Sequence, residues 1–200
     1  MILLDAPQDK ANLVAHSWRE KEERIDFRMH TDHYGLCRNM FEIIQVAGNV
    51  LKPDDEAIAA IVDADDRLSK RAFETVVKVY QGKPKTLITH GSYVKMSKGR
   101  RTKISRPNPK RGNIRELPWR SSHLKTIKWK VIKQAKPQWF QHKGKWLNAA
   151  SDLALMFGCI EIAGLSRVEF VQRCIYYWYN EWSAEKVAAQ KYCENKLRAK

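Results

Sequence analysis

The residues best suited to chemistry in this sequence are its cations, because they are concentrated in one segment. Residues 78–148 hold 20 lysines and arginines and a single acid, Glu116, between flanks that are mildly acidic or nearly neutral. Guanidinium and ammonium groups gathered on one surface bind phosphates and release condensed counterions. The pattern predicts a nucleic-acid-binding protein, with DNA preferred over RNA. The predicted phosphate contacts are Lys98, Arg100, Arg101, Lys103, Arg106, Lys110, Arg111, Arg115, Arg120, Lys125, Lys128, Lys130 and Lys133.

Aromatic residues are interleaved with these cations. Bases stack on aromatic rings in proteins that bind single strands, and we predict base stacking for three rings. They are Tyr93, Trp119 and Trp139. Trp129 is expected in the core instead, because residues 127–131 alternate between an apolar face and a lysine face, as a half-buried strand does.

Two acidic clusters could serve a different chemistry. Residues 54–56 follow Pro53 and are typical of a helix start, whereas residues 63–66 indicate a solvated run. An alternative is a metal-dependent nuclease, which would need carboxylates of the two clusters to meet and hold Mg²⁺. A further alternative is a basic interaction protein that docks on an acidic protein partner. We predict no catalytic residue, no metal and no cofactor, and consider an enzyme the less favoured class.

A third pattern, at the N-terminal side, could bind a metal. His30, His33 and Cys37 are three and four residues apart, a spacing that one turn of helix brings together. A structural zinc site needs a fourth ligand, and no second Cys or His pair lies nearby. The pattern therefore favours ordinary polar residues at a junction between a strand and a helix.

The helices and strands expected from the sequence pattern indicate an α+β fold, with terminal helices packed on a small antiparallel sheet and a long basic arm. Residues 1–82 are predicted to be mainly helical and mildly acidic, 83–148 basic and β-rich with a flexible arm at 97–118, and 149–200 helical. Ser166 and Glu169 are spaced as in a capping box and predict a helix through Trp178. The three segments are predicted to form one folded unit.

The ends and the cysteines of the chain indicate a compartment. No stretch approaches the ~20 apolar residues that a membrane span needs, and the first residues do not resemble a signal peptide. Four widely spaced cysteines are typical of reduced thiols. We therefore expect a cytoplasmic protein without a membrane partner.

Two short stretches carry a resemblance to a known family. Residues 144–149 (Gly-Lys-Trp-Leu-Asn-Ala) and 166–170 (Ser-Arg-Val-Glu-Phe) resemble the phage recombination mediators called Orf or NinB. The resemblance covers about a tenth of the chain. It implies an origin in a phage or mobile element. For the nucleic-acid-binding protein predicted above, we expect a role in replication, recombination or transcription control.

Overall fold

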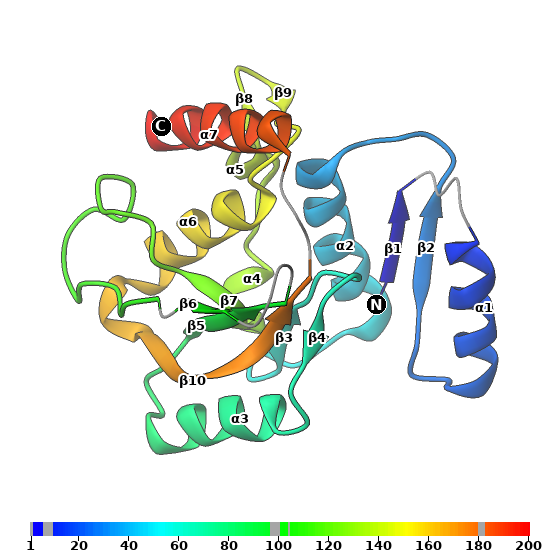
Figure 1. The fold of residues 1–200 in the computed structure, drawn as a ribbon, viewed down its shortest axis with the longest axis horizontal. Coiled ribbons are helices and arrows are strands. Elements are labelled where there is room, and N and C mark those ends of the chain that lie inside the picture. The colour runs from blue at the N-terminus through cyan, green and yellow to red at the C-terminus, as the bar shows by residue number, and fades with distance from the viewer. Residues whose placement is uncertain (1, 6–9, 97–100, 104, 180–182) are drawn as a thin grey trace.

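A curled mixed sheet lies at the centre of the fold (Figure 1). The structure is a computed structural model that describes residues 2–5, 10–96, 101–103, 105–179 and 183–200. The strands of the sheet lie in the order β3-β7-β5-β10-β4, and β6 pairs with β5. Their bounds are β3 (Ile58–Ile61), β4 (Arg67–Leu68), β5 (Ile88–Lys95), β6 (Arg101–Lys103), β7 (Ser122–Lys128) and β10 (Val168–Trp178).

The strand directions bring distant segments to one edge of this sheet. Strand β7 is antiparallel to both β3 and β5, and β10 is parallel to β5. The carboxyl ends of β3, β5 and β10 therefore meet at the edge where β7 begins. In open sheets that carry helices, ligands bind outside the carboxyl ends of strands.

Helices cover both faces of the sheet. On one face α3 (Ala72–Gly82) packs against β10, and a small apolar cluster joins its Val76 to Ile175 and Tyr176 (Figure 1). The larger core lies on the other face. It involves α2 (Leu36–Leu51), α4 (Trp129–Ile132), α5 (Pro137–Phe140), α6 (Ser151–Ala163) and α7 (Ala184–Arg198).

Helix α6 is the centre of the larger core. Nine of its residues are buried, and its sequence is apolar on all sides, as expected for a helix enclosed by other elements. Gly158 allows α5 to approach, because a Cβ added there would lie 2.2 Å from Cδ2 of the Trp139 ring. The carboxylate of Asp152 thus sits at the start of a helix that packing holds firmly in place.

The N-terminal part forms a smaller unit beside the main sheet. Strands β1 (Ile2–Asp5) and β2 (Phe27–His30) pair in parallel, with α1 (Ala11–Lys21) connecting them (Figure 1). Asp5 accepts hydrogen bonds from the backbone N–H groups of Tyr34 and Gly35, at 2.9 and 3.1 Å. This carboxylate therefore fixes the turn that leads into α2. A short hairpin, β8 (Gln141–His142) and β9 (Lys145–Trp146), lies before α6.

The α+β class is confirmed, and the sheet is mixed rather than antiparallel. Residues 166–178 were predicted to be helical but form a short 3-10 turn, η1 (Leu165–Arg167), followed by β10. Residues after Pro53 were predicted to start a helix but lead into β3. Strands of the central sheet come from all three segments of the predicted division, β3 and β4 from the first and β10 from the last.

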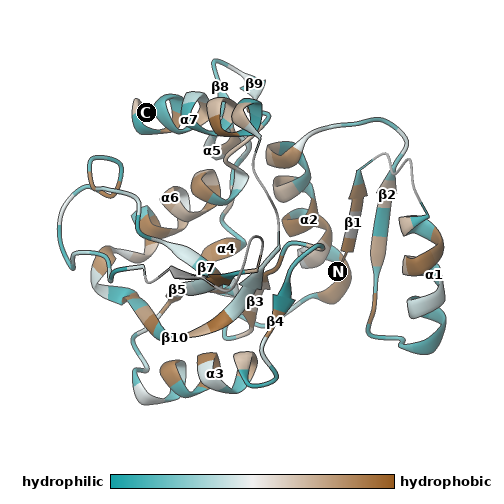
Figure 2. Cartoon of the chain, viewed as in Figure 1, coloured by the Kyte–Doolittle hydropathy of each residue, from teal (hydrophilic) through white to brown (hydrophobic). Residues whose placement is uncertain are grey.

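Of the predicted arm, residues 101–103 form β6, and residues 105–118 form a loop that is anchored to β10 and to helices α6 and α7. This loop is largely hydrophilic (Figure 2), yet it is anchored at several points. Asn108 is buried and donates a 2.9 Å hydrogen bond to Ser121, and Ile114 lies in the larger core. Arg198 donates hydrogen bonds to two backbone carbonyls of the loop. Residues 97–100 and 104 lie outside the described residues.

Candidate active site

An acidic turn lies at the sheet edge described above. Residues 62–66 follow β3 directly, so Asp63, Asp65 and Asp66 leave the sheet at the carboxyl end of a strand. Asp66 Oδ1 accepts a hydrogen bond from the backbone of Tyr179, and the backbone N–H of Asp63 donates to the hydroxyl of Tyr176, at 3.2 Å. The end of β10 therefore holds the turn in place, while the side chains of Asp63 and Asp65 remain exposed.

A second carboxylate group lies at the same edge. Lys125 of β7 is paired in register with Ile61, the last residue of β3, and its side chain is only 2% exposed. Its Nζ lies 2.9 Å from Oδ2 of Asp152, whose side chain keeps 33% of its surface exposed. Asp152 Oδ1 accepts a hydrogen bond from the backbone N–H of Leu153, at 2.8 Å. The carboxylate is therefore held from behind by a buried cation and open on its other side.

A cluster of aromatic rings packs beside the acidic turn. The His123 ring stacks on the Tyr176 ring, with centroids 4.6 Å apart and planes at 20°. Tyr93 meets His123 edge-on, and Trp178 meets Tyr93 edge-on. Tyr176 also accepts the backbone N–H of Asp63, and His123 Nδ1 lies 3.4 Å from Lys125 Nζ, so the rings link the acidic turn to the cation that pairs with Asp152.

The charges of the site act on one another. The side chain of Asp63 reaches the surface, but the surrounding protein removes much of the water near its carboxylate, and this desolvation is the main cause that raises its pKa. Asp152, Asp66 and Asp65 add to the rise, and Lys125 opposes it. Burial acts in the same direction on Asp152, but Lys125, His123 and the backbone N–H of Leu153 lower its pKa overall. Asp152 is therefore ionised at neutral pH, and its negative charge contributes to the raised pKa of Asp63.

The described residues form no metal centre from protein side chains alone. Within the described residues, no group of three or more His, Cys, Asp or Glu side chains is arranged to hold a metal ion. His30 instead pairs with Glu42 at 2.9 Å, His33 with Asp5 at 2.8 Å, and the Cys37 thiol donates to the Ala149 carbonyl. Magnesium, however, is commonly held by one or two carboxylates together with the phosphates of a substrate.

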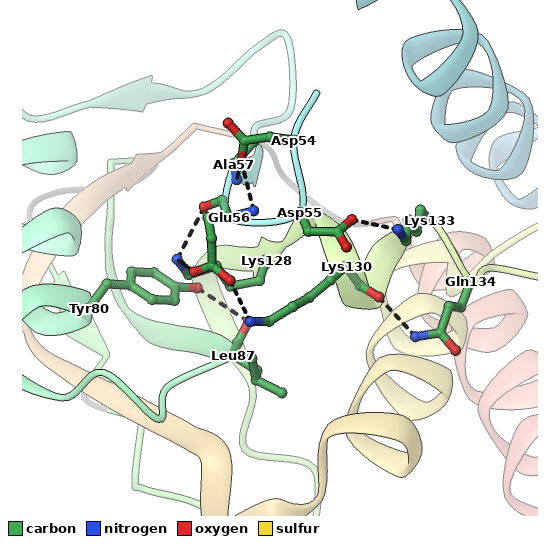
Figure 3. Close-up of polar contacts among 10 residues, drawn as sticks. All are labelled: Asp54, Asp55, Glu56, Ala57, Tyr80, Leu87, Lys128, Lys130, Lys133 and Gln134. Atoms are coloured by element: carbon green, nitrogen blue, oxygen red, sulfur yellow. Dashed lines mark hydrogen bonds and ion pairs between the residues drawn. The ribbon is translucent and has the colours of Figure 1, made fainter. Parts of the chain in front are cut away.

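The other acidic cluster lies at the opposite end of β3 and has a structural role. Glu56 forms ion pairs with Lys128 and Lys130, at 2.7 and 2.5 Å, and Asp55 forms one with Lys133 at 2.5 Å (Figure 3). The strand separates this cluster from residues 63–66, so the arrangement expected of a two-cluster nuclease is not present. Three predicted phosphate contacts are thus engaged with acids of the chain itself.

Several further cations of the basic segment have internal partners. Lys110 pairs with Glu169 at 2.9 Å, Arg115 pairs with Glu161, and Arg120 donates to the Pro107 carbonyl. Arg106 and Arg111 are exposed and form no ion pair within the described part of the chain. Arg101 and Lys103 lie in β6, and Lys98 and Arg100 lie outside the described residues.

The predicted stacking rings have different surroundings. Trp119 meets Phe157 edge-on with centroids 5.6 Å apart, and Trp139 packs against Gly158, so both rings contribute to the larger core. Trp129 is buried, as expected, although it begins α4 instead of continuing the strand. Tyr93 alone of the three candidates lies beside the carboxylates.

Comparison with known proteins finds solved structures with a similar fold. No family model and no curated protein sequence matches this chain. A crystal structure of Staphylococcus aureus TarS, residues 1–349, is similar with a TM-score of 0.60 and 13% identity, over 89% of this chain and 50% of that one. A second S. aureus TarS structure gives a TM-score of 0.61 and 13% identity, over 90% and 30%. The fold resembles that of TarS. TarS is a glycosyltransferase, and this chain spans half of the TarS chains or less.

The prediction of a nucleic-acid-binding protein is wrong. The fold neighbours have a different function, and nothing in the described part of the chain supports nucleic-acid binding. The resemblance to phage recombination mediators is not supported by any family match. Within the described residues, no helix is both long and apolar enough to cross a bilayer.

Proposed function

We propose that this chain is a glycosyltransferase domain that transfers a sugar from a nucleotide-activated donor to a hydroxyl group. The observation that carries the proposal is the convergence of Asp63, Asp65 and Asp152 at the carboxyl edge of a sheet whose fold resembles TarS. The exposed carboxylates of the acidic turn could bind a cation that in turn binds the diphosphate of the donor. Asp152, which is held separately, could accept a proton.

Asp63 and Asp65 are the residues that would hold a divalent cation together with the donor. They are exposed, they follow one strand, and the backbone of the turn is anchored by Tyr176 and Tyr179. Two carboxylates fit an ion such as Mg²⁺ or Mn²⁺ that takes its other ligands from phosphates and water. Such an ion neutralises charge on the diphosphate that leaves.

Asp152 is the residue suited to act as the general base. It is ionised, fixed at two positions, and open on one side. In the proposed step the carboxylate takes the proton of the acceptor hydroxyl, and the hydroxyl oxygen forms a bond to the anomeric carbon of the donor. The bond from that carbon to the diphosphate breaks, and its electron pair leaves with the phosphate. A single displacement of this kind inverts the anomeric centre.

The proposal is tested first by nucleotide binding. A ligand present at 100 times its Kd stabilises a protein by ~2.7 kcal/mol, which for a chain of this size raises Tm by roughly 5–10 °C. We expect one nucleoside diphosphate among those of uridine, guanosine, adenosine and cytidine to give such a rise with Mg²⁺ or Mn²⁺. Asp65→Asn should abolish the rise, whereas Asp55→Asn, at the other end of β3, should leave it unchanged.

Turnover is the second test. With the matching nucleotide sugar, transfer to a hydroxyl acceptor or to water should fall by ~10²- to 10⁴-fold in Asp152→Asn, the usual contribution of a general base. Nucleotide binding should persist in that variant. The proposal is wrong if no nucleoside diphosphate binds with either metal, or if Asp152→Asn keeps full turnover.

A further inference from the structure

We propose that Lys125, supported by His123, is a positioning residue that fixes Asp152 and keeps it ionised for proton transfer. The inference rests on the proposed function and extends it to two residues of β7 that do not reach the donor or the acceptor. The geometry that points to it is a continuous series of contacts from the acidic turn through Tyr176, His123 and Lys125 to Asp152.

The burial of Lys125 is the first step. An ammonium group removed from water costs several kcal/mol unless it is paired and hydrogen-bonded. Lys125 is among the largest fully buried side chains of the protein, and its Nζ has two neighbours, Asp152 Oδ2 at 2.9 Å and His123 Nδ1 at 3.4 Å. An apolar side chain of similar volume would pack here at lower cost. A charge at this place therefore indicates a need for a fixed anion beside it.

His123 provides the second neighbour in a defined state. Burial, reinforced by Lys125, lowers the pKa of His123 to about 3, with Asp152 opposing the shift. The ring is therefore neutral at neutral pH, and its Nδ1 can accept a hydrogen bond from the ammonium when Nε2 carries the ring hydrogen. Stacking on Tyr176 fixes the plane of the ring, so the ammonium is directed toward the single exposed carboxylate it contacts.

Asp152 is the group on which this arrangement acts. Lys125 and His123 face it from β7, Asp63 faces it from the acidic turn, and the Cys37 thiol faces it from α2. Burial raises the pKa of Cys37 to about 12, so the thiol is neutral. Lys125 is thus the cation that offsets both the burial of Asp152 and the negative charge of Asp63. Without it, the carboxylate would take up a proton more readily and lose its fixed orientation.

The direct test is the titration of Asp152 in the intact chain without donor. Carboxyl carbons of ¹³C-labelled aspartate are followed by NMR from pH 2 to 8 at roughly one-unit steps, and Asp152→Asn identifies the signal. In the wild-type chain we expect Asp152 to titrate below the ordinary range of an aspartate. In Lys125→Met it should titrate above that range, and in Lys125→Arg the low value should return. A wild-type Asp152 that titrates in or above the ordinary range overturns the inference, even if Lys125→Met fails to fold.

Turnover separates positioning from simple structural support. Lys125→Met should lower kcat near neutral pH by about 100-fold, the effect of a misplaced catalytic group, with KM for the donor unchanged. The acidic limb of its pH–rate profile should move to higher pH, and Lys125→Arg should restore it. Lys128→Met is the matched control, because that lysine lies on the same strand and pairs with Glu56 away from the site. An acidic limb that does not move in a folded Lys125→Met variant contradicts the inference.

The two proposals fail in different ways. If the glycosyltransferase function is wrong, nucleoside diphosphates bind to none of the variants, while the NMR titration still reports the effect of Lys125 on Asp152. If only the positioning role is wrong, the nucleotide binds normally and Asp152 titrates alike in the wild-type chain and in Lys125→Met.

Discussion

The contact between Gly158 and Trp139 allows a sharp prediction about the packing that holds α6. In Gly158→Ala the new Cβ would lie 2.2, 2.3 and 2.5 Å from three carbons of the indole ring. Carbon atoms in contact prefer ~3.5–4.0 Å, so the ring or the helix must move by roughly 1 Å or more. Such overpacking costs ~1–3 kcal/mol, and a clash this close favours the upper end of that range.

The helical preference of alanine offsets part of this cost. Replacing a helical glycine by alanine gains up to ~1 kcal/mol, so we expect Gly158→Ala to lose ~2 kcal/mol of unfolding free energy. For a chain of this length that lowers Tm by roughly 4–8 °C. Thermal and denaturant unfolding measure both quantities.

Two further variants separate the cost of the steric overlap from other effects of the substitution. Gly82→Ala at the end of α3 is the matched control, because its Cβ meets no atom within 4 Å, and it should leave Tm unchanged or slightly higher. In a Trp139→Leu background, Gly158→Ala should cost less than in the wild-type chain, since the smaller side chain leaves room. The reasoning is refuted if Gly158→Ala is as stable as Gly82→Ala, or if its cost does not change when the indole is removed.

Other predictions follow from burial and pKa. Tyr80→Phe removes a buried hydroxyl that lies 3.1 Å from Thr126 Oγ1, and should lower Tm by roughly 2–4 °C, as expected for ~1 kcal/mol. Alkylation followed by mass spectrometry should modify one cysteine of the native chain, the partly exposed Cys174, and all four after unfolding. Burial lowers the pKa of His90 to about 4, so the unfolded chain binds more protons between pH 6.5 and 4. Stability should therefore fall as pH drops through that interval, and His90→Gln should weaken the fall; an unchanged slope in this variant would count against a buried neutral His90.

Elements with independent local signals were predictable from the sequence. Ser183 is a residue type that caps helices and precedes the terminal helix, and its hydroxyl accepts the backbone N–H of Lys186 at 3.3 Å. Helix α2 likewise carries apolar residues at helical spacing, such as Met40, Ile43 and Ile44. In both cases a cap or a continuous period lies within the segment itself, so no tertiary information was needed.

Strand β10 was not predicted because an irregularity in its pairing with β5 interrupts the alternation of apolar and polar residues. Val171 pairs with Gly91 and Tyr176 with Tyr93, so the register with β5 shifts between them and an irregularity interrupts the alternation of faces. The remaining apolar residues, Val171, Ile175 and Trp178, are then spaced three and four apart, which imitates a helix. The segment is a strand because β5 and β4 pair with it on both sides.

The candidate site was misread for a related reason. The cations of residues 78–148 were treated as a free surface, whereas their acidic partners are distant in the sequence, such as Glu56 for Lys128 and Asp152 for Lys125. Asp63 and Asp65 were interpreted as solvated because residues 63–66 hold three carboxylates, most of which must point to solvent. Apolar residues 58–61 followed at once by carboxylates are equally typical of a strand that ends at a ligand-binding edge, and that was the signal available.

The placement of Lys125 explains how a strongly basic chain can carry a carboxylate site. If the acidic turn and Asp152 faced each other with only water between them, each would raise the pKa of the other and both would protonate more easily. Lys125 enters from the strand next to β3 and lies within electrostatic reach of both groups, so it lowers the pKa of Asp152 and opposes the rise at Asp63. Among the described residues its ion pair is with Asp152 and not with the acidic turn, which leaves the exposed carboxylates of the turn available to a cation. One buried charge can thus favour a general base on one side of the site and a metal-binding turn on the other.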